Sequence, residues 1–192
     1  MVKGSHNSLT YYKPKKWWMW KYKCQNKTFE KQIMSGIHAF DIKVRFDNNN
    51  NVHVTNGRYT SEESWSHYSF VSYILDTISL INPTDRKYFI NLTLDTNDVN
   101  LFQEINFIQL CNKFVKHSKT NKHIILGGRR TFDNDKVVVT LQDTYIVKSV
   151  AGCDTRTRFY EKWFPSLFAK RMNKNNLKFW EDKDCIAFFD FL

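Results

Sequence analysis

The sequence is poor in cysteine and contains no long apolar run. Its four cysteines, Cys24, Cys111, Cys153 and Cys185, lie far apart and form no Cys-x-x-Cys pair, so a zinc site is not expected and reduced thiols are. No apolar run approaches the ~20 residues of a membrane-spanning helix, and the first residues lack the apolar stretch of a secretory signal. These features predict a cytoplasmic protein without a transmembrane segment.

Several motifs of common enzyme and nucleic-acid-binding classes are also missing. There is no Gly-rich phosphate loop, Gly-x-Ser-x-Gly elbow, His-Glu-x-x-His pair, helix-turn-helix or zinc finger. Acidic residues are in deficit, because 29 Lys and Arg face 19 Asp and Glu, which gives a net charge of +10. This excess of positive charge favours an anionic partner, whether a phosphorylated substrate, an acidic lipid surface or nucleic acid.

What the sequence does contain is typical of a folded protein. Hydrophobic residues make up 42% and aromatic residues 16% of its 192 residues, which argues against disorder and predicts a single domain over 1–192. Helices are expected at 27–35, 61–82 (with Ser61 as N-cap), 99–118 and 157–172, and strands at 36–46, 52–60, 87–96, 122–131, 136–143 and 185–192. Alternating strands and helices predict parallel strands with helical crossovers, and therefore one α/β domain.

Polar residues recur where the expected strands end. In a parallel α/β sheet or barrel, functional groups gather at the carboxyl ends of the strands. His6 follows a short expected first strand, and Asp190 lies in the apolar final strand, where a buried carboxylate needs a partner. Asp41, Lys43 and Arg45 lie on one face of the strand expected at 36–46. Asn56 lies in the strand expected at 52–60, and Arg129 and Arg130 lie near the end of the one at 122–131. We expect these groups to meet at one mouth of the domain.

Five stretches together carry a resemblance to a known family. "GSHNSLTYY", "GIHAFDIKVRF" and "NNNNVHVTNGRYT" resemble the opening of the phosphatidylinositol-specific phospholipase C-like phosphodiesterases. "AGCDTRTRFYEKWFPSLFAKRMN" and "FFDFL" are similar to later segments of its compact bacterial and phage members. The resemblance implies a small, distorted (β/α) barrel of the TIM type, an origin in a bacterium or its phage, a phosphodiester substrate such as a phospholipid headgroup, and no cofactor.

The resemblance also implies roles for individual residues. The family cleaves a phosphodiester with one histidine as general base and a second as general acid. His6 matches the base, Asp41 the acidic residue of the second strand, and Lys43 an arginine that replaces calcium, so no metal is implied. Asp190 matches a residue that orients the base. Substrate contacts are expected at Asn7, Arg45, Arg129 and Arg130.

Asn56 departs from the family pattern, because it stands where the second histidine is expected. Asparagine cannot donate a proton as a general acid, although it can hydrogen-bond to a leaving oxygen or a phosphate. His53 lies three residues earlier and points to the opposite face of the strand. Three functions therefore stay open: a metal-independent phosphodiesterase, an impaired relative that binds a phosphorylated ligand, and a basic module for a membrane surface or, less favoured, nucleic acid.

The segment "KPKKWWMWKYK", residues 13–23, mixes aromatic and basic side chains. Trp17, Trp18 and Trp20 among lysines suit the headgroup layer of a membrane, which predicts a peripheral membrane contact. The same mixture could stack bases and bind phosphates. A third interpretation is purely structural, with the segment folded over the end of the barrel and its tryptophan rings filling the core.

Overall fold

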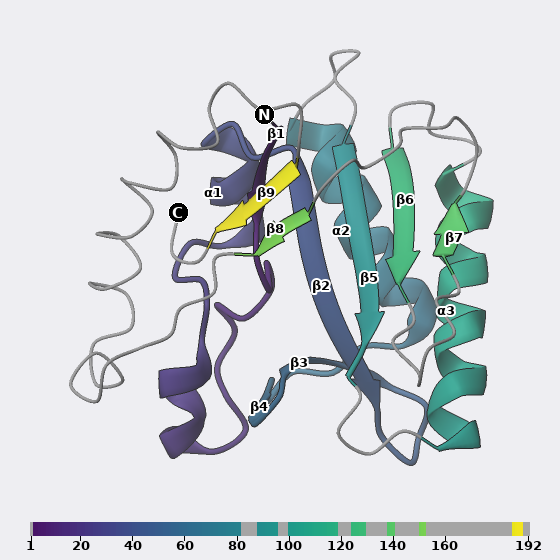
Figure 1. The fold of residues 1–192 in the computed structure, drawn as a ribbon. Coiled ribbons are helices and arrows are strands. Elements are labelled where there is room, and N and C mark those ends of the chain that lie inside the picture. Colours follow the sequence, from purple (N-terminus) through teal and green to yellow (C-terminus); the bar gives the residue numbers. More distant parts are fainter. Residues whose placement is uncertain are drawn as a thin grey trace.

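The computed structural model describes residues 2–81, 88–95, 100–118, 124–129, 138–140, 150–152 and 186–189 (Figure 1). The elements in chain order are β1 (Val2–Ser5), η1 (Trp17–Tyr22), α1 (Phe29–Met34), β2 (Ala39–Phe46), β3 (Val52–Asn56), β4 (Tyr59–Thr60), α2 (His67–Ile81), β5 (Tyr88–Leu94), α3 (Leu101–Ser118), β6 (Ile124–Arg129), β7 (Val138–Thr140), β8 (Val150–Gly152) and β9 (Ile186–Phe189). Element η1 is a 3₁₀ helix.

The strands form one sheet in the order β7-β6-β5-β2-β1-β9-β8. From β6 through to β8 all neighbours are parallel, whereas β7 is antiparallel to β6 and β3 is antiparallel to β2. In Figure 1 helix α2 passes behind β5 and β6, and helix α3 runs along the side of the sheet beyond β6. The predicted α/β class is confirmed, and within the described residues the sheet is open, which agrees with a distorted barrel.

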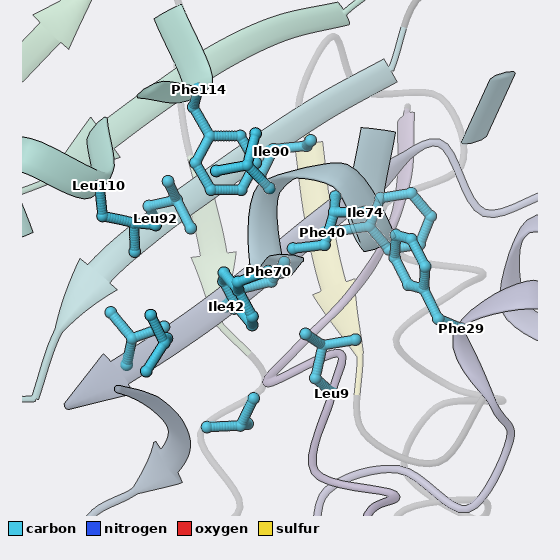
Figure 2. Close-up of a cluster of buried hydrophobic side chains, with 14 of the residues drawn as sticks. Leu9, Phe29, Phe40, Ile42, Phe70, Ile74, Ile90, Leu92, Leu110 and Phe114 are labelled. Carbon is cyan, nitrogen blue, oxygen red and sulfur yellow. The ribbon is translucent and has the colours of Figure 1, made fainter. Parts of the chain in front are cut away.

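Strand β2 separates the core from the polar side of the sheet. Its even-numbered residues Phe40, Ile42, Val44 and Phe46 are buried against α2 and α3, as Figure 2 shows for Phe40 and Ile42. Side chains alternate along a strand, so Asp41, Lys43 and Arg45 lie on the opposite face. Each large apolar side chain buried here stabilises the fold by about 1.5–3 kcal/mol. The alternation predicted from the sequence is therefore confirmed.

The helix predicted at 61–82 begins later than expected, at His67. Ser61 is no N-cap, because its backbone N–H bonds to the Val54 carbonyl and its hydroxyl accepts from the Val54 N–H. Trp65 also pairs with Val52 in both directions. The cap is Ser66, whose hydroxyl accepts from the Ser69 N–H. Pairing with β3 thus outcompetes the first turn of the predicted helix.

Two of the predicted strands differ in the structure. Residues 52–60 are not one strand, because the turn at Gly57 and Arg58 folds β4 back on β3, and Gly57 has the positive φ of 59° that this tight turn requires. The strand at 136–143 appears as β7, but it is not parallel to β6, since residues 130–137 are too few for a parallel crossover. Strand β8 was not predicted, and the helix predicted at 157–172 lies outside the described residues.

Candidate functional site

His6 is the residue that directly follows β1, and the pairing of β1 with β2 places it beside Asp41. Ser5 is in register with Phe40 of β2. The next residues along these parallel strands, His6 and Asp41, therefore lie side by side just beyond the carboxyl end of β1. Asn7 adopts a left-handed backbone with φ of 45°, which turns the chain after His6. The turn is fastened by the Ser8 N–H, which donates to the Asp41 carbonyl at 2.7 Å.

The carboxylate of Asp41 is buried and held from three sides. Its Oδ2 lies 3.6 Å from His6 Nε2 and accepts from the Asn7 backbone N–H at 3.4 Å. Its Oδ1 accepts from the Asn91 side-chain amide at 2.8 Å. The His6 side chain is 33% exposed, so one part of the ring faces the carboxylate while another stays accessible. A fixed carboxylate beside an imidazole stabilises the protonated ring.

Asn91 was missed by the sequence analysis. It lies on β5, where the register pairs it with Asp41 of β2. The signal in the sequence is only that an asparagine interrupts an otherwise apolar strand. Its partner could not be identified without knowing that β5 lies next to β2.

A second group of contacts joins Asn7 to Asn56 through a thiol. The side-chain amide of Asn7 lies 3.0 Å from His6 Nε2 and 3.4 Å from Cys24 Sγ. The amide of Asn56 donates to the same sulfur at 3.1 Å and to the Tyr22 carbonyl at 3.1 Å. The structure therefore places Asn56 on the same side of the molecule as His6. Cys24 was not predicted there, because no spacing in the sequence relates it to either asparagine.

Lys43 and Arg45 continue the polar face of β2 beyond Asp41. Arg45 lies 3.5 Å from the buried carboxylate of Asp95 at the end of β5, so its charge is already engaged within the fold. Lys43 is half-buried and in register with Thr93 of β5. In the part of the chain that the structure describes, no carboxylate forms an ion pair with Lys43. Of the two cations, Lys43 is thus the better placed to meet an anionic ligand.

Of the remaining predicted site residues, Arg129 is described by the structure, whereas Arg130 and Asp190 are not. Arg129 is the last residue of β6, where the register pairs it with Thr93 of β5. Arg130 and Asp190 fall outside the described residues, so their roles stay predictions. No cluster of three or more His, Cys, Asp and Glu suited to a metal ion occurs among the residues described.

The tryptophans of η1 are exposed rather than packed in the core. Trp17 is 81%, Trp18 37% and Trp20 44% exposed, whereas Met19 and Tyr22 of the same element pack against the core. The structural interpretation, in which the tryptophan rings fill the core, is therefore wrong. None of the helices described is long and apolar enough to cross a bilayer.

Solved structures with this arrangement of strands and helices include bacterial phosphatidylinositol-specific phospholipases C. A mutant of the protein from Staphylococcus aureus matches with a TM-score of 0.64 at 16% identity, over 99% of this chain and 85% of that one. The protein from Listeria monocytogenes matches with a TM-score of 0.59 at 14% identity, over 99% and 87%. The chain shares their fold. No protein family model and no curated protein sequence matches it.

This likeness confirms the predicted resemblance at the level of the fold, which in these phospholipases is of the TIM-barrel type. At such low identity it says nothing by itself about the reaction. The chemistry has to be argued from His6 just beyond the end of β1 and from the residues of β2 and β5 that lie beside it.

Proposed function

We propose that this protein is a phosphodiesterase of the phospholipase C type with His6 as its general base. The observation that carries the proposal is the carboxylate of Asp41, held by Asn91 and by the Asn7 N–H and lying 3.6 Å from His6 Nε2. When His6 removes a proton from an attacking hydroxyl, the ring becomes positive, and the buried carboxylate stabilises that charge. The fold shared with phosphatidylinositol-specific phospholipases supports this class of substrate.

Lys43 supplies the positive charge that the phosphoryl oxygens need in the transition state. It lies two residues along β2 from Asp41, on the same face, which corresponds to about 7 Å. An ammonium in a half-buried site interacts more strongly with an oxyanion than it would in water. The reaction proposed is the attack of a neighbouring hydroxyl on phosphorus, with no metal ion taking part.

The test is turnover of phosphatidylinositol and of an aryl phosphodiester of inositol, measured with a chelator present. We expect His6→Ala to lower kcat/KM by ~10²–10⁴. The matched control is His53→Ala, because His53 bonds to Asp47 and to the Ser61 carbonyl away from the site. Activity that survives His6→Ala would show that another group is the base and would overturn the mechanism.

A second candidate function is the binding of a phosphorylated ligand without turnover. Asn56 favours it, because its amide can hydrogen-bond to a phosphate but cannot protonate a leaving group. Calorimetric titration with inositol phosphate distinguishes the two. Binding that is lost in Lys43→Ala, together with no turnover of either substrate, would establish the binding function and exclude the enzyme.

The exposed tryptophans of η1 support a peripheral contact with a phospholipid surface. Amphipathic tryptophan rings suit the headgroup layer, and Lys15 and Lys16 next to them are exposed. Two other lysines of the segment serve the fold, since Lys13 pairs with Glu62 at 2.6 Å and Lys23 donates to the Tyr11 carbonyl at 2.8 Å. One solved relative from Staphylococcus aureus was studied for its membrane binding.

A further inference from the structure

The thiol of Cys24 occupies the region in which the proposed reaction needs a proton donor. Cys24 Sγ lies 3.1 Å from the amide nitrogen of Asn56 and 3.4 Å from that of Asn7. The second of these amides also lies 3.0 Å from His6 Nε2. The thiol and the imidazole are therefore separated by a single asparagine side chain. Asn56 stands where a proton donor is expected, and Cys24 is an ionisable side chain in contact with it.

Cys24 is fixed in this position by its own backbone. Its N–H donates to the Thr10 hydroxyl at 2.9 Å, and Thr10 belongs to the turn that follows His6. The residue is 7% exposed, so it is mostly buried but not sealed. Its weak S–H contact, to the Tyr22 carbonyl, is long at 3.9 Å.

The two amides are arranged to stabilise the sulfur after it has lost its proton. Both Asn7 and Asn56 direct N–H groups at Sγ. Hydrogen bonds donated to the charged form of an acid favour that form. Two such donors at one sulfur lower the cost of giving up the proton, and this gives Asn56 a role although it cannot be an acid itself.

A second, independent observation concerns the side-chain oxygen of Asn7, beside His6 and Cys24. Asn7 is only 1% exposed, yet its side-chain oxygen has no hydrogen-bond partner among the described residues. An unsatisfied buried polar group costs about 1–3 kcal/mol. This oxygen belongs to the amide that touches both the imidazole and the thiol. It is suited to accept a hydrogen bond from a hydroxyl group of a bound ligand, such as an inositol ring.

We propose that Cys24 is the general acid of this protein, in place of the second histidine. The inference rests on the proposed function. His6 takes the proton of the attacking hydroxyl as its oxygen bonds to phosphorus. The bond from phosphorus to the leaving oxygen breaks, and the S–H proton passes to that oxygen. The thiolate is then held by the amides of Asn7 and Asn56. Afterwards the imidazolium releases its proton to water and the thiolate regains one from water.

The test compares two substrates that differ only in the leaving group. Diacylglycerol in phosphatidylinositol is a poor leaving group that needs a proton, whereas an aryl oxide such as p-nitrophenolate leaves without one. We expect Cys24→Ala to lower kcat/KM by ~10²–10⁴ on phosphatidylinositol and to leave the aryl substrate within roughly tenfold of the original protein. Adding Asn56→His to Cys24→Ala is expected to restore activity on phosphatidylinositol. Activity on the aryl substrate also reports that the variant is folded.

The matched control is Cys111→Ala. Cys111 lies on α3 and packs against the hydrophobic core, and burial raises the pKa of its thiol to about 12, which makes it a poor proton donor. Equal losses on the two substrates, or no loss on phosphatidylinositol, would overturn the role of Cys24 and leave the proposed function standing. If the original protein cleaves neither substrate, the proposed function fails and the inference fails with it.

Discussion

At the scale of single residues, the arrangement around Asp41 shows which site residues can be found from their positions on expected strands and which cannot. His6, Asp41 and Asn56 converge because each ends or lines a strand of the same sheet, and that rule can be applied to a sequence. Asn91 and Cys24 depend on information of another kind. Asn91 reaches Asp41 through the register of β2 with β5, and Cys24 reaches Asn56 through the path of the chain after η1. Neither register nor path can be deduced from spacing.

Asn91 gives a prediction at this scale. Asn91→Leu removes the donor to Asp41 Oδ1 and leaves a buried carboxylate oxygen unsatisfied, which is expected to cost about 1–3 kcal/mol in the free energy of unfolding. Because the carboxylate also loses its orientation toward His6, we expect kcat to fall while KM changes little. Urea denaturation and steady-state kinetics measure the two effects.

A control variant separates the loss of stability from the loss of orientation. Ile90 is adjacent to Asn91 but faces the core, and Ile90→Val is expected to cost about 0.5–1.5 kcal/mol without affecting kcat. If Asn91→Leu leaves kcat unchanged, as Ile90→Val is expected to do, then Asn91 contributes to stability alone and does not position Asp41.

At the scale of secondary structure elements, the end of β2 is closed by a helix side chain. Gln103 of α3 accepts from the Phe46 N–H at 2.9 Å and donates to the Phe46 carbonyl at 2.6 Å. The amide thus bonds to the strand as a neighbouring strand would. The position of Gln103 on the buried side of α3 cannot be guessed from the sequence, where a glutamine in an amphipathic helix is usually assigned to solvent.

We predict that Gln103→Leu destabilises the fold strongly, because two buried backbone groups of Phe46 lose their partner at about 1–3 kcal/mol each. Gln109→Leu is the matched control, since Gln109 is exposed on the same helix, and its effect is expected to stay within about 0.5 kcal/mol. The midpoint of urea unfolding measures both. Similar midpoints for the two variants would show that the bonds to Phe46 contribute nothing net.

The limits of element prediction have the same physical origin. The helix predicted from 61 starts at His67 because residues 61–65 pair with β3 instead. Ser61 and Ser66 are equally acceptable N-caps by residue type. Only the tertiary pairing of Trp65 with Val52 decides between them. This pairing cannot be read from the local sequence pattern around the two serines.

At the scale of the whole molecule, the order of strands and helices was predictable and the closure of the sheet was not. Alternating apolar strands and amphipathic helices predicted the parallel core of β1, β2, β5 and β6, but not the antiparallel β3. The antiparallel β7 follows from a connection that is too short, over 130–137, for a crossover. The open path from β7 to β8 among the described strands depends on the global geometry of the sheet.

The net charge of +10 and the exposed tryptophans give a prediction at this scale. We expect the protein to sediment with vesicles that contain anionic phosphatidylinositol, and Trp17→Ala combined with Trp18→Ala and Trp20→Ala to weaken this binding roughly tenfold or more. Added salt is expected to weaken the binding as well, because it screens the lysines. Thermal unfolding is expected to change little.

The control for the vesicle experiment is Leu80→Ala on α2. Leu80 is 83% exposed, so it tests whether any exposed apolar side chain promotes binding. Equal binding by the triple tryptophan variant and the original protein would exclude η1 as the contact.

The position of β1 between β2 and β9 affects the order in which the sheet is completed during synthesis. Gly4 pairs with Ala39 on one side and with Phe188 on the other, 35 and 184 residues along the chain. During synthesis β1 can pair with β2 early, but its other edge stays open until β9 has left the ribosome. Pairing over so long a separation is slow. The strand that leads into His6 therefore gains its second neighbour among the last in the sheet, and the turn at His6 is fixed on both sides only after β9 has been made.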